Sequence, residues 1–117
     1  MANPIVWFEV IGQDADKMKA FYGKLFGWEY DNLPEMGGYG LVKDAKPVPG
    51  GIGQAPEGNG WTTFYVGVDD IDATLSEAQA TGGTLLMPKM TLPDGGLIAV
   101  FADPEGRPVG LFQGQTA

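Results

Sequence analysis

The chain has no cysteine and no histidine among its 117 residues. Without cysteine it can form no disulfide, no thiolate nucleophile and no thiolate site for a metal ion. Without histidine it lacks the side chain that most often serves as a general base near neutral pH and most often ligates transition metals. Serine occurs once, as Ser76, so a Ser-His-Asp hydrolase is excluded.

Positive charge and long apolar runs are also scarce. Seven Lys and Arg residues stand against fifteen Asp and Glu residues, which gives a net charge of −8. Such a chain repels a phosphate backbone, so we expect no nucleic-acid partner. No run of about 18 apolar residues could span a membrane, and the N-terminus lacks the basic and apolar pattern of a secretory signal. We therefore expect no membrane association and a cytoplasmic location.

The first half of the chain reads as a strand followed by a helix and further strands. Residues 4–11 are rich in β-branched and aromatic side chains, which predicts a strand. Asp14 or Asp16 is expected to cap a helix that Gly27 ends. Apolar residues at helical spacing form one face of that helix: Met18, Phe21, Tyr22, Leu25 and Phe26. Short strands are expected within residues 28–32, 38–44 and 50–54, and residues 55–60 are the best linker candidate.

The second half repeats this order. Residues 61–68 predict a strand, and Asp69 or Asp70 is expected to cap a helix that ends at Gly82 and Gly83. Its apolar face holds Ile71, Leu75 and Ala78. Further strands are expected within residues 84–89, 95–102 and 107–113.

The two halves can be aligned with each other so that Phe8 corresponds to Phe64 and Asp14 to Asp70. In this alignment the matches fall on the strand, the helix cap, the helix end and the turn, which indicates an internal repeat. Each half is then a βαβββ module, and a single module would expose a large sheet face, so two must pair. We predict an α+β fold in which two paired modules form an eight-stranded open cup with helices on the outer face. Residues 1–117 would be one domain of two modules, 1–57 and 58–117. The alternative is that the two halves of an ordinary α+β chain are similar by chance.

Strand alternation separates two faces. Phe8 and Val10 share an apolar face that a helix would cover, whereas Trp7 and Glu9 point the other way. The repeated strand divides likewise into Thr62, Phe64, Val66 and Val68 against Trp61, Thr63, Tyr65 and Gly67. A face that mixes large aromatic side chains with a carboxylate and a hydroxyl suits a small-molecule cavity.

Three segments resemble the vicinal oxygen chelate superfamily, which includes glyoxalases, extradiol dioxygenases and bleomycin-resistance proteins. They are DADKMKAFYGKLFGW (14–28), VDDIDATLSEAQATGG (68–83) and FADPEGRPVGLFQ (101–113). The resemblance implies paired βαβββ modules, an open cup and commonly a dimer. We accordingly expect a homodimer.

The resemblance also implies where metal-using members would hold their ion. In this chain the four positions are occupied by Trp7, Gln54, Thr63 and Gly110. Gln54 is included because the internal repeat, with its offset of 56 residues, places it in the first module where Gly110 stands in the second. Gln54 alone of these is similar to a good metal ligand. We therefore expect neither a metal ion nor another cofactor, which disfavours glyoxalase, dioxygenase and fosfomycin-type transfer chemistry, since these need a cation.

The predicted site follows from these faces and positions. Glu9 is the candidate acid-base residue, and the candidate ligand-binding residues are Trp7, Gln54, Trp61, Thr63, Tyr65 and Phe112. Two alternatives stay open, because Glu9 could be purely structural and the aromatic side chains could fill a core or a dimer contact. The glycine-rich stretches 37–40 and 50–53 lack the Lys-Ser or Lys-Thr of a phosphate loop and are interpreted as turns and bulges.

Two classes of function fit these residues. The first is a metal-free, bleomycin-resistance-like protein that binds a small molecule, planar or aromatic, in an aromatic-lined cup. The second is a metal-independent isomerase, lyase or cyclase that uses Glu9. A subunit of a larger assembly without a ligand of its own is a third interpretation.

Overall fold

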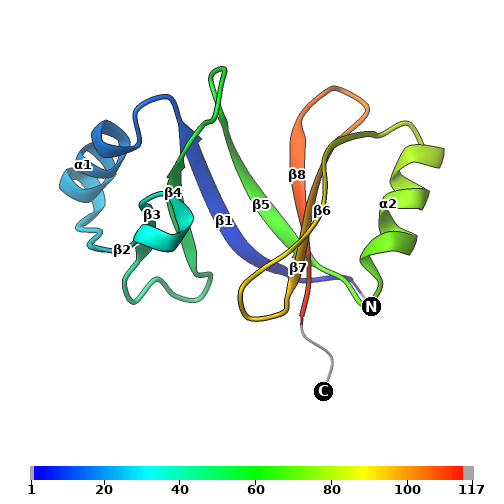
Figure 1. Ribbon diagram of the computed structural model, residues 1–117, viewed down its shortest axis with the longest axis horizontal. Helices are drawn as coiled ribbons and strands as arrows, with labels where there is room; N and C mark the ends of the chain where they lie inside the picture. The colour runs from blue at the N-terminus through cyan, green and yellow to red at the C-terminus, as the bar shows by residue number, and fades with distance from the viewer. Residues whose placement is uncertain (1, 115–117) are drawn as a thin grey trace. The chain divides into compact units, whose positions relative to one another are not determined.

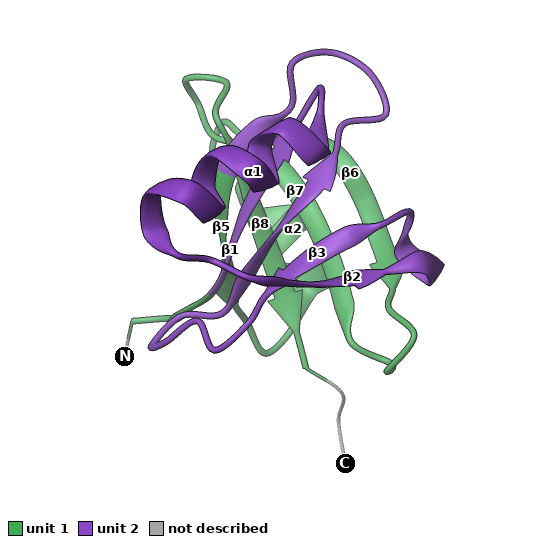
Figure 2. Cartoon of the chain, turned by 90° about the vertical axis from the view of Figure 1, so that its left-hand side faces the viewer, with its two compact units in different colours: residues 1–6, 63–117 green, residues 7–62 purple. Residues whose placement is uncertain are grey.

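The computed structural model describes residues 2–114 of the chain. Within them it contains eight strands, two α-helices and one short 3-10 helix. The strands form an open, unclosed sheet of an α+β fold, which confirms the predicted fold class. The chain divides into two compact units, residues 7–62 and residues 1–6 with 63–117 (Figure 2). The single domain with a module boundary at residue 57 stays a prediction.

The unit of residues 7–62 has βαβββ topology. Its elements are β1 (Ile5–Gly12, from residue 7 on), α1 (Ala15–Phe26), β2 (Tyr30–Leu33), η1 (Pro34–Met36), β3 (Tyr39–Val42) and β4 (Gly50–Gln54). The strands follow the order β2-β3-β4-β1; β4 runs parallel to β1, and the other two pairings are antiparallel. The glycines of residues 50–53 lie inside strand β4, so their interpretation as turns and bulges is wrong.

Helix α1 begins and ends where the sequence signals predict. The side chain of Asp14 accepts a hydrogen bond from the backbone nitrogen of Lys17 at 3.1 Å, so Asp14 rather than Asp16 is the N-cap. Gly27 ends the helix in the left-handed conformation, with φ of 72°. A residue with a side chain would be strained there, which explains why glycine stops this helix.

The apolar face of α1 is only partly covered. Tyr22 and Phe26 pack against Trp28, with ring centroids 5.7 and 5.4 Å away, and Trp28 in turn lies 5.3 Å from Phe8 of β1. Phe21, Leu25 and Phe26 nevertheless stay 55, 58 and 59 % exposed. The turn of helix nearest Gly27 thus presents uncovered apolar surface.

The second unit repeats the topology of the first. Its elements are β5 (Trp61–Gly67, from residue 63 on), α2 (Ile71–Ala80), β6 (Thr84–Thr91), β7 (Leu97–Ala102) and β8 (Pro108–Gln113), seen in Figure 1. The strand order is β5-β8-β7-β6, and β8 runs parallel to β5. Asp70 caps α2, and the helix packs Ile71 against Val68, Ala99 and Leu111 in a buried cluster.

The repeat offset that brings Phe8 onto Phe64 holds only through the helix starts. Glu9 pairs with Gly51 between β1 and β4, whereas its repeat partner Tyr65 pairs with Gly110 between β5 and β8. The repeat partner of Gly110 is therefore Gly51, and the predicted pairing with Gln54 is wrong. The offset grows after the helices, where β6 has 8 residues and its counterpart β2 has 4.

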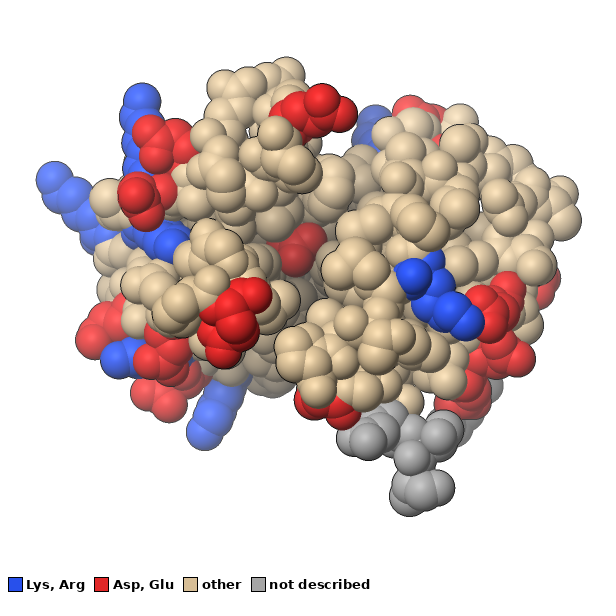
Figure 3. Space-filling view, viewed as in Figure 1, with Lys and Arg blue, Asp and Glu red and all other residues tan. Residues whose placement is uncertain are grey.

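On the face seen in Figure 3, Lys and Arg side chains lie beside Asp and Glu side chains. Five of the seven cationic residues belong to the unit of residues 7–62, namely Lys17, Lys19, Lys24, Lys43 and Lys46. Within residues 2–114, no helix is both long enough and apolar enough to cross a bilayer.

Candidate functional site

Three predicted site residues, Trp7, Glu9 and Trp61, belong to one hydrogen-bond network in the unit of residues 7–62. The indole nitrogen of Trp61 donates to Oε2 of Glu9 at 3.2 Å. The hydroxyl of Tyr39 donates to Oε1 of the same carboxylate at 3.1 Å and accepts from the indole nitrogen of Trp7 at 3.1 Å. The carboxylate thus accepts at both oxygens, with two tryptophans and one tyrosine around it.

The network is largely shielded from water. Glu9 is 8 % exposed, and the three aromatic side chains are half-buried. Burial, and then the negative charge of Glu9, raise the pKa of the Tyr39 hydroxyl far above its ordinary value of 10.0. Tyr39 is therefore a neutral hydrogen-bond donor to Glu9 throughout the physiological pH range.

Glycines of β4 make room for the Tyr39 ring. A Cβ atom at Gly51 would lie 2.2 Å from Cε1 of Tyr39, and one at Gly53 would lie 2.7 Å from its Cδ2. Glycine inside a strand often marks such a close approach. The alternating glycines of β4 are thus explained by the aromatic ring that covers them.

Gln54, a predicted ligand-binding residue, ties the end of β4 to the start of α1. Its Oε1 accepts from the backbone nitrogen of Ala15 at 2.9 Å, and its Nε2 donates to the backbone oxygen of Gln13. Gln113 makes the matching contact at the end of β8, where its Oε1 accepts from the backbone nitrogen of Ile71 at 2.8 Å. Both glutamines satisfy a free N–H group at a helix N-terminus.

The other three predicted residues belong to the second unit. Thr63 is 7 % exposed, and its hydroxyl donates to the backbone oxygen of Pro108 at 2.6 Å. Tyr65 is 5 % exposed, and its ring covers Gly110, where a Cβ atom would lie 2.5 Å from Cδ2. Phe112 is half-buried on β8.

The four positions at which the resemblance places metal ligands supply a poor donor set. Trp7 has an indole N–H, which donates and cannot ligate, and Gly110 has no side chain. The hydroxyl of Thr63 and the amide of Gln54 are engaged with backbone groups. Across residues 2–114, no group of three or more His, Cys, Asp or Glu side chains is arranged to hold a metal ion. These residues do not fit a protein-held divalent ion.

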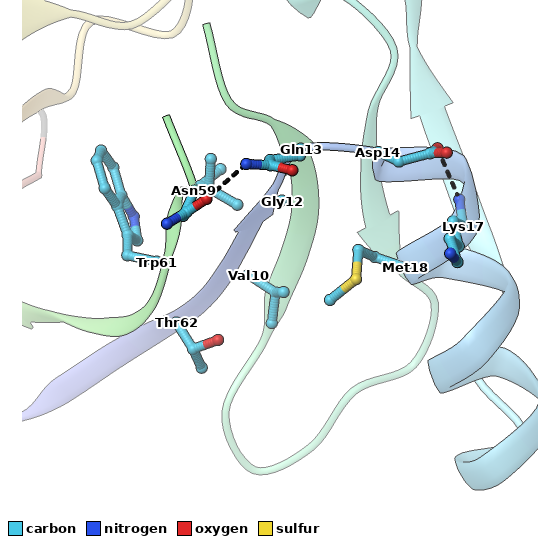
Figure 4. Close-up of a pocket in the computed structure, with 10 residues that line it drawn as sticks. Val10, Gly12, Gln13, Asp14, Lys17, Met18, Asn59, Trp61 and Thr62 are labelled. Atoms are coloured by element: carbon cyan, nitrogen blue, oxygen red, sulfur yellow. Dashed lines mark hydrogen bonds between the residues drawn. The ribbon is translucent and has the colours of Figure 1, made fainter. Parts of the chain in front are cut away.

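A pocket of about 530 Å³ opens at the junction of β1, α1 and the segment before β5 (Figure 4). The side chain of Trp61 forms part of its wall, and so do Gln13 and Asn59, whose Nε2 and Oδ1 atoms are joined by a hydrogen bond of 2.5 Å. The lining residues are Val10, Ile11, Gly12, Gln13, Asp14, Lys17, Met18, Asn59, Trp61 and Thr62. Because Trp61 also binds Glu9, a ligand in this pocket would touch the network at one of its members.

Sequence reasoning missed Tyr39, the residue that links Trp7 to Glu9. The signal for it was the pair of glycines at alternate positions of a predicted strand, Gly51 and Gly53. Such a pattern clears one face of the strand for a large neighbouring side chain. Tyr39 is the only aromatic residue on β3, which is one of the two strands that pair with β4.

The two βαβββ units, with β4 parallel to β1 and β8 parallel to β5, define a protein built from a repeated module. Residues 4–110 match the model of the Glyoxalase/Bleomycin resistance protein/Dioxygenase superfamily. The chain belongs to this superfamily.

Two groups of curated relatives are similar over most of the chain. A protein of Mycobacterium tuberculosis named "Putative glyoxylase CFP32" is 37 % identical, over 92 % of this chain and 44 % of the relative. The anthracycline biosynthesis protein DnrV of Streptomyces peucetius is 32 % identical, over 86 % of this chain and 43 % of the relative. The chain thus spans less than half the length of the curated relatives it matches.

Solved structures share the fold at low sequence identity. A hypothetical protein of Bacillus halodurans, BH1468, superposes with a TM-score of 0.70 at 12 % identity, over 100 % of this chain and 98 % of that one. Methylmalonyl-CoA epimerase of Streptomyces coelicolor superposes with a TM-score of 0.62 at 18 % identity, over 100 % of both chains. At these identities the likeness concerns the fold alone.

Proposed function

We propose that this chain is a small-molecule binding protein that works without a bound metal ion. Its binding surface would be the Glu9 carboxylate with the indole rings of Trp7 and Trp61, and the Tyr39 hydroxyl would hold the carboxylate from within. The observation that carries the proposal is that carboxylate, 8 % exposed and held at both oxygens by aromatic donors. The donor set at Trp7, Gln54, Thr63 and Gly110 supports the metal-free part.

The ligand class we propose is a planar molecule that carries a hydrogen-bond donor or an amine. Indole rings offer large contact areas with little side-chain entropy to lose, and stacking adds about 0.5–1.5 kcal/mol per pair beyond area burial. A buried carboxylate favours a donor or a cation, since charge-assisted hydrogen bonds are the strong ones. The similarity to DnrV, whose name places it in anthracycline biosynthesis, supports a planar aromatic ligand.

The test is calorimetric titration with doxorubicin, a planar anthracycline that carries an amine, in the presence of EDTA. We expect a dissociation constant in the micromolar range, which corresponds to roughly −8 kcal/mol. Trp7→Ala and Glu9→Gln should each weaken binding about tenfold or more, because each removes a direct contact. Trp28→Ala is the matched control, since Trp28 packs on Phe8 and Tyr22 instead.

Two results would contradict this proposal. One is affinity for planar amines that neither Trp7→Ala nor Glu9→Gln changes, which would move the binding surface elsewhere. The other is binding that EDTA abolishes and a divalent ion restores, which would refute the metal-free part.

The second candidate function is a metal-independent isomerase, lyase or cyclase in which Glu9 takes or gives a proton. A shielded carboxylate beside a neutral hydroxyl donor favours it, because general acid-base catalysis needs a positioned proton carrier. Incubation of a bound compound in D₂O distinguishes the two functions. An enzyme of this kind would exchange a carbon-bound proton for deuterium and lose that exchange in Glu9→Gln, whereas a binding protein would exchange none.

We also propose that the chain forms a homodimer through the uncovered apolar face of α1. Phe21, Leu25 and Phe26 are each more than half exposed on that face. Grouped exposed apolar side chains commonly mark an interaction site. A second copy of this chain is the occupant we propose, because the resemblance to the superfamily implies that a dimer is common.

Light scattering behind size exclusion tests the dimer. We expect about twice the chain mass of 12.4 kDa for the wild type and the chain mass itself for Leu25→Lys, because a charge in the core of an interface is strongly disfavoured. Gln79→Lys, at an exposed polar position of α2, should leave the dimer intact. A wild-type monomer at tens of micromolar, or a dimer that survives Leu25→Lys, would contradict the proposal.

A further inference from the structure

We propose that Tyr39 is a positioning residue that fixes the carboxylate of Glu9 and, through it, the indole of Trp61. The inference rests on the proposed binding role of Glu9 and adds to it the residue that determines how the carboxylate is presented. Tyr39 would act through Glu9 rather than on the ligand itself.

The direction of the hydrogen bonds supports this role. An indole N–H can only donate, so Trp7 must donate to the hydroxyl oxygen of Tyr39, 3.1 Å away. The single hydroxyl proton of Tyr39 is then directed at Oε1 of Glu9, also at 3.1 Å. Trp61 donates to Oε2 at 3.2 Å. Each oxygen of the carboxylate thus has an assigned donor, and the polarity of the chain from Trp7 to Glu9 cannot reverse.

The close packing of the Tyr39 ring against β4 makes its hydroxyl a hydrogen-bond donor of fixed position. Gly51 and Gly53 lie so closely under the ring that a Cβ atom would come within 2.2 Å of a ring carbon at Gly51 and within 2.7 Å at Gly53. A neutral hydroxyl is retained as well, because burial and the Glu9 charge raise the pKa of Tyr39. A hydrogen-bond donor of fixed place and fixed protonation is what a positioning role requires.

A purely space-filling role for Tyr39 gives a different expectation. In that case the ring would cover the β4 glycines, and the loss of the hydroxyl would affect only Trp7, which donates to it directly. If Tyr39 positions Glu9, the loss of the hydroxyl also frees the Glu9 carboxylate to move. The hydrogen bond of Trp61 then changes as well, because its indole donates to the opposite oxygen of the same carboxylate.

The experiment follows the indole N–H signals of the three tryptophans by ¹⁵N–¹H NMR, assigned with single Trp→Phe variants. In Tyr39→Phe, the Trp7 signal should shift because its acceptor is gone. The Trp61 signal should shift too, and its N–H should exchange with D₂O roughly 5- to 10-fold faster, as expected for a weakened hydrogen bond. The Trp28 signal should stay in place. Tyr30→Phe is the control, since it removes one hydroxyl hydrogen bond, to the backbone oxygen of Lys19, in the same unit.

The outcomes separate this inference from the proposed function. An unchanged Trp61 signal in Tyr39→Phe, with Trp7 shifted, would overturn the positioning role whatever Glu9 binds. Gly51→Ala, which displaces the Tyr39 ring without removing its hydroxyl, should move both signals, and an unmoved Trp61 would again contradict the inference. Doxorubicin affinity that is insensitive to Glu9→Gln would instead refute the proposed function while leaving the network result standing.

Discussion

Gly60→Ala is expected to destabilise the protein by more than about 3 kcal/mol, or to prevent folding. A Cβ atom at residue 60 would lie 1.8 Å from the backbone oxygen of Ile11 and 2.6 Å from its carbonyl carbon. Both obstructing atoms are backbone atoms of strand β1, so no side-chain rotation relieves the overlap. Gly60 also has φ of 77°, where a side chain adds roughly 1–2 kcal/mol of strain.

Gly58→Ala is a matched control for this prediction. Gly58 lies shortly before Gly60 with φ of 74°, and a Cβ atom there would meet nothing within 4 Å. It should therefore cost only the conformational strain, about 1–2 kcal/mol. Urea unfolding of both variants gives the difference, which isolates the contact with β1. Equal losses would mean that residue 60 does not approach β1 as closely as the structure has it.

The effect should extend to the Glu9 network, because Gly60 directly precedes Trp61. If Gly60→Ala folds, the overlap with Ile11 must be relieved by a shift of the segment that carries the indole. The hydrogen bond from Trp61 to Glu9 spans 3.2 Å, near the long end for an N–H donor, and tolerates little displacement. We therefore expect a red-shifted tryptophan emission in Gly60→Ala and an unchanged one in Gly58→Ala.

Much of the fold could be predicted from local signals. Asp14 and Asp70 as helix caps, Gly27 as a helix stop and the period-2 strands all act over short stretches of chain, so the sequence carries them directly. The repeat offset could not be followed to the end of the chain. It grows after the helices because β6 is longer than β2, and the length of each of these strands depends on how far it pairs with the strand that follows it, β7 or β3.

The hydrogen-bond network around Glu9 could be predicted only in part, and its role as a binding site stays a prediction. Strand alternation alone placed Trp7 and Glu9 on one face, and the structure brings these two and Trp61 together around a common carboxylate and hydroxyl. Tyr39 belongs to another strand, and its ring packs over Gly51 of the neighbouring strand. The alternation of side chains within one strand does not predict such a contact between strands. Residues 55–60 have the composition of a linker, yet Gly60 contacts the backbone of β1, a constraint that composition does not reveal.

The stability of the protein should fall at alkaline pH because of Tyr39. Burial and the charge of Glu9 raise its pKa in the folded state above the ordinary value of 10.0 that applies to the unfolded chain. Below pH 10 the hydroxyl is protonated in both states, so its full contribution to stability is present. Above pH 10 the unfolded chain releases this proton while the folded protein keeps it, and the contribution is lost by about 1.4 kcal/mol per pH unit.

Urea unfolding between pH 9 and pH 11.5 should therefore show a steeper loss of stability in the wild type than in Tyr39→Phe, by about 2 kcal/mol over the range. The difference between the two proteins cancels the lysines and the other tyrosines, which titrate alike in both. Tyr30→Phe should reduce the slope less, because Tyr30 is more exposed and only burial raises its pKa. Glu9→Gln removes the negative charge that is the second cause of the raised Tyr39 pKa. The loss of stability with rising pH should therefore level off at a lower pH in this variant than in the wild type. Parallel curves for the wild type and Tyr39→Phe would mean that the Tyr39 hydroxyl is not buried beside Glu9, which would contradict the hydrogen bond between them.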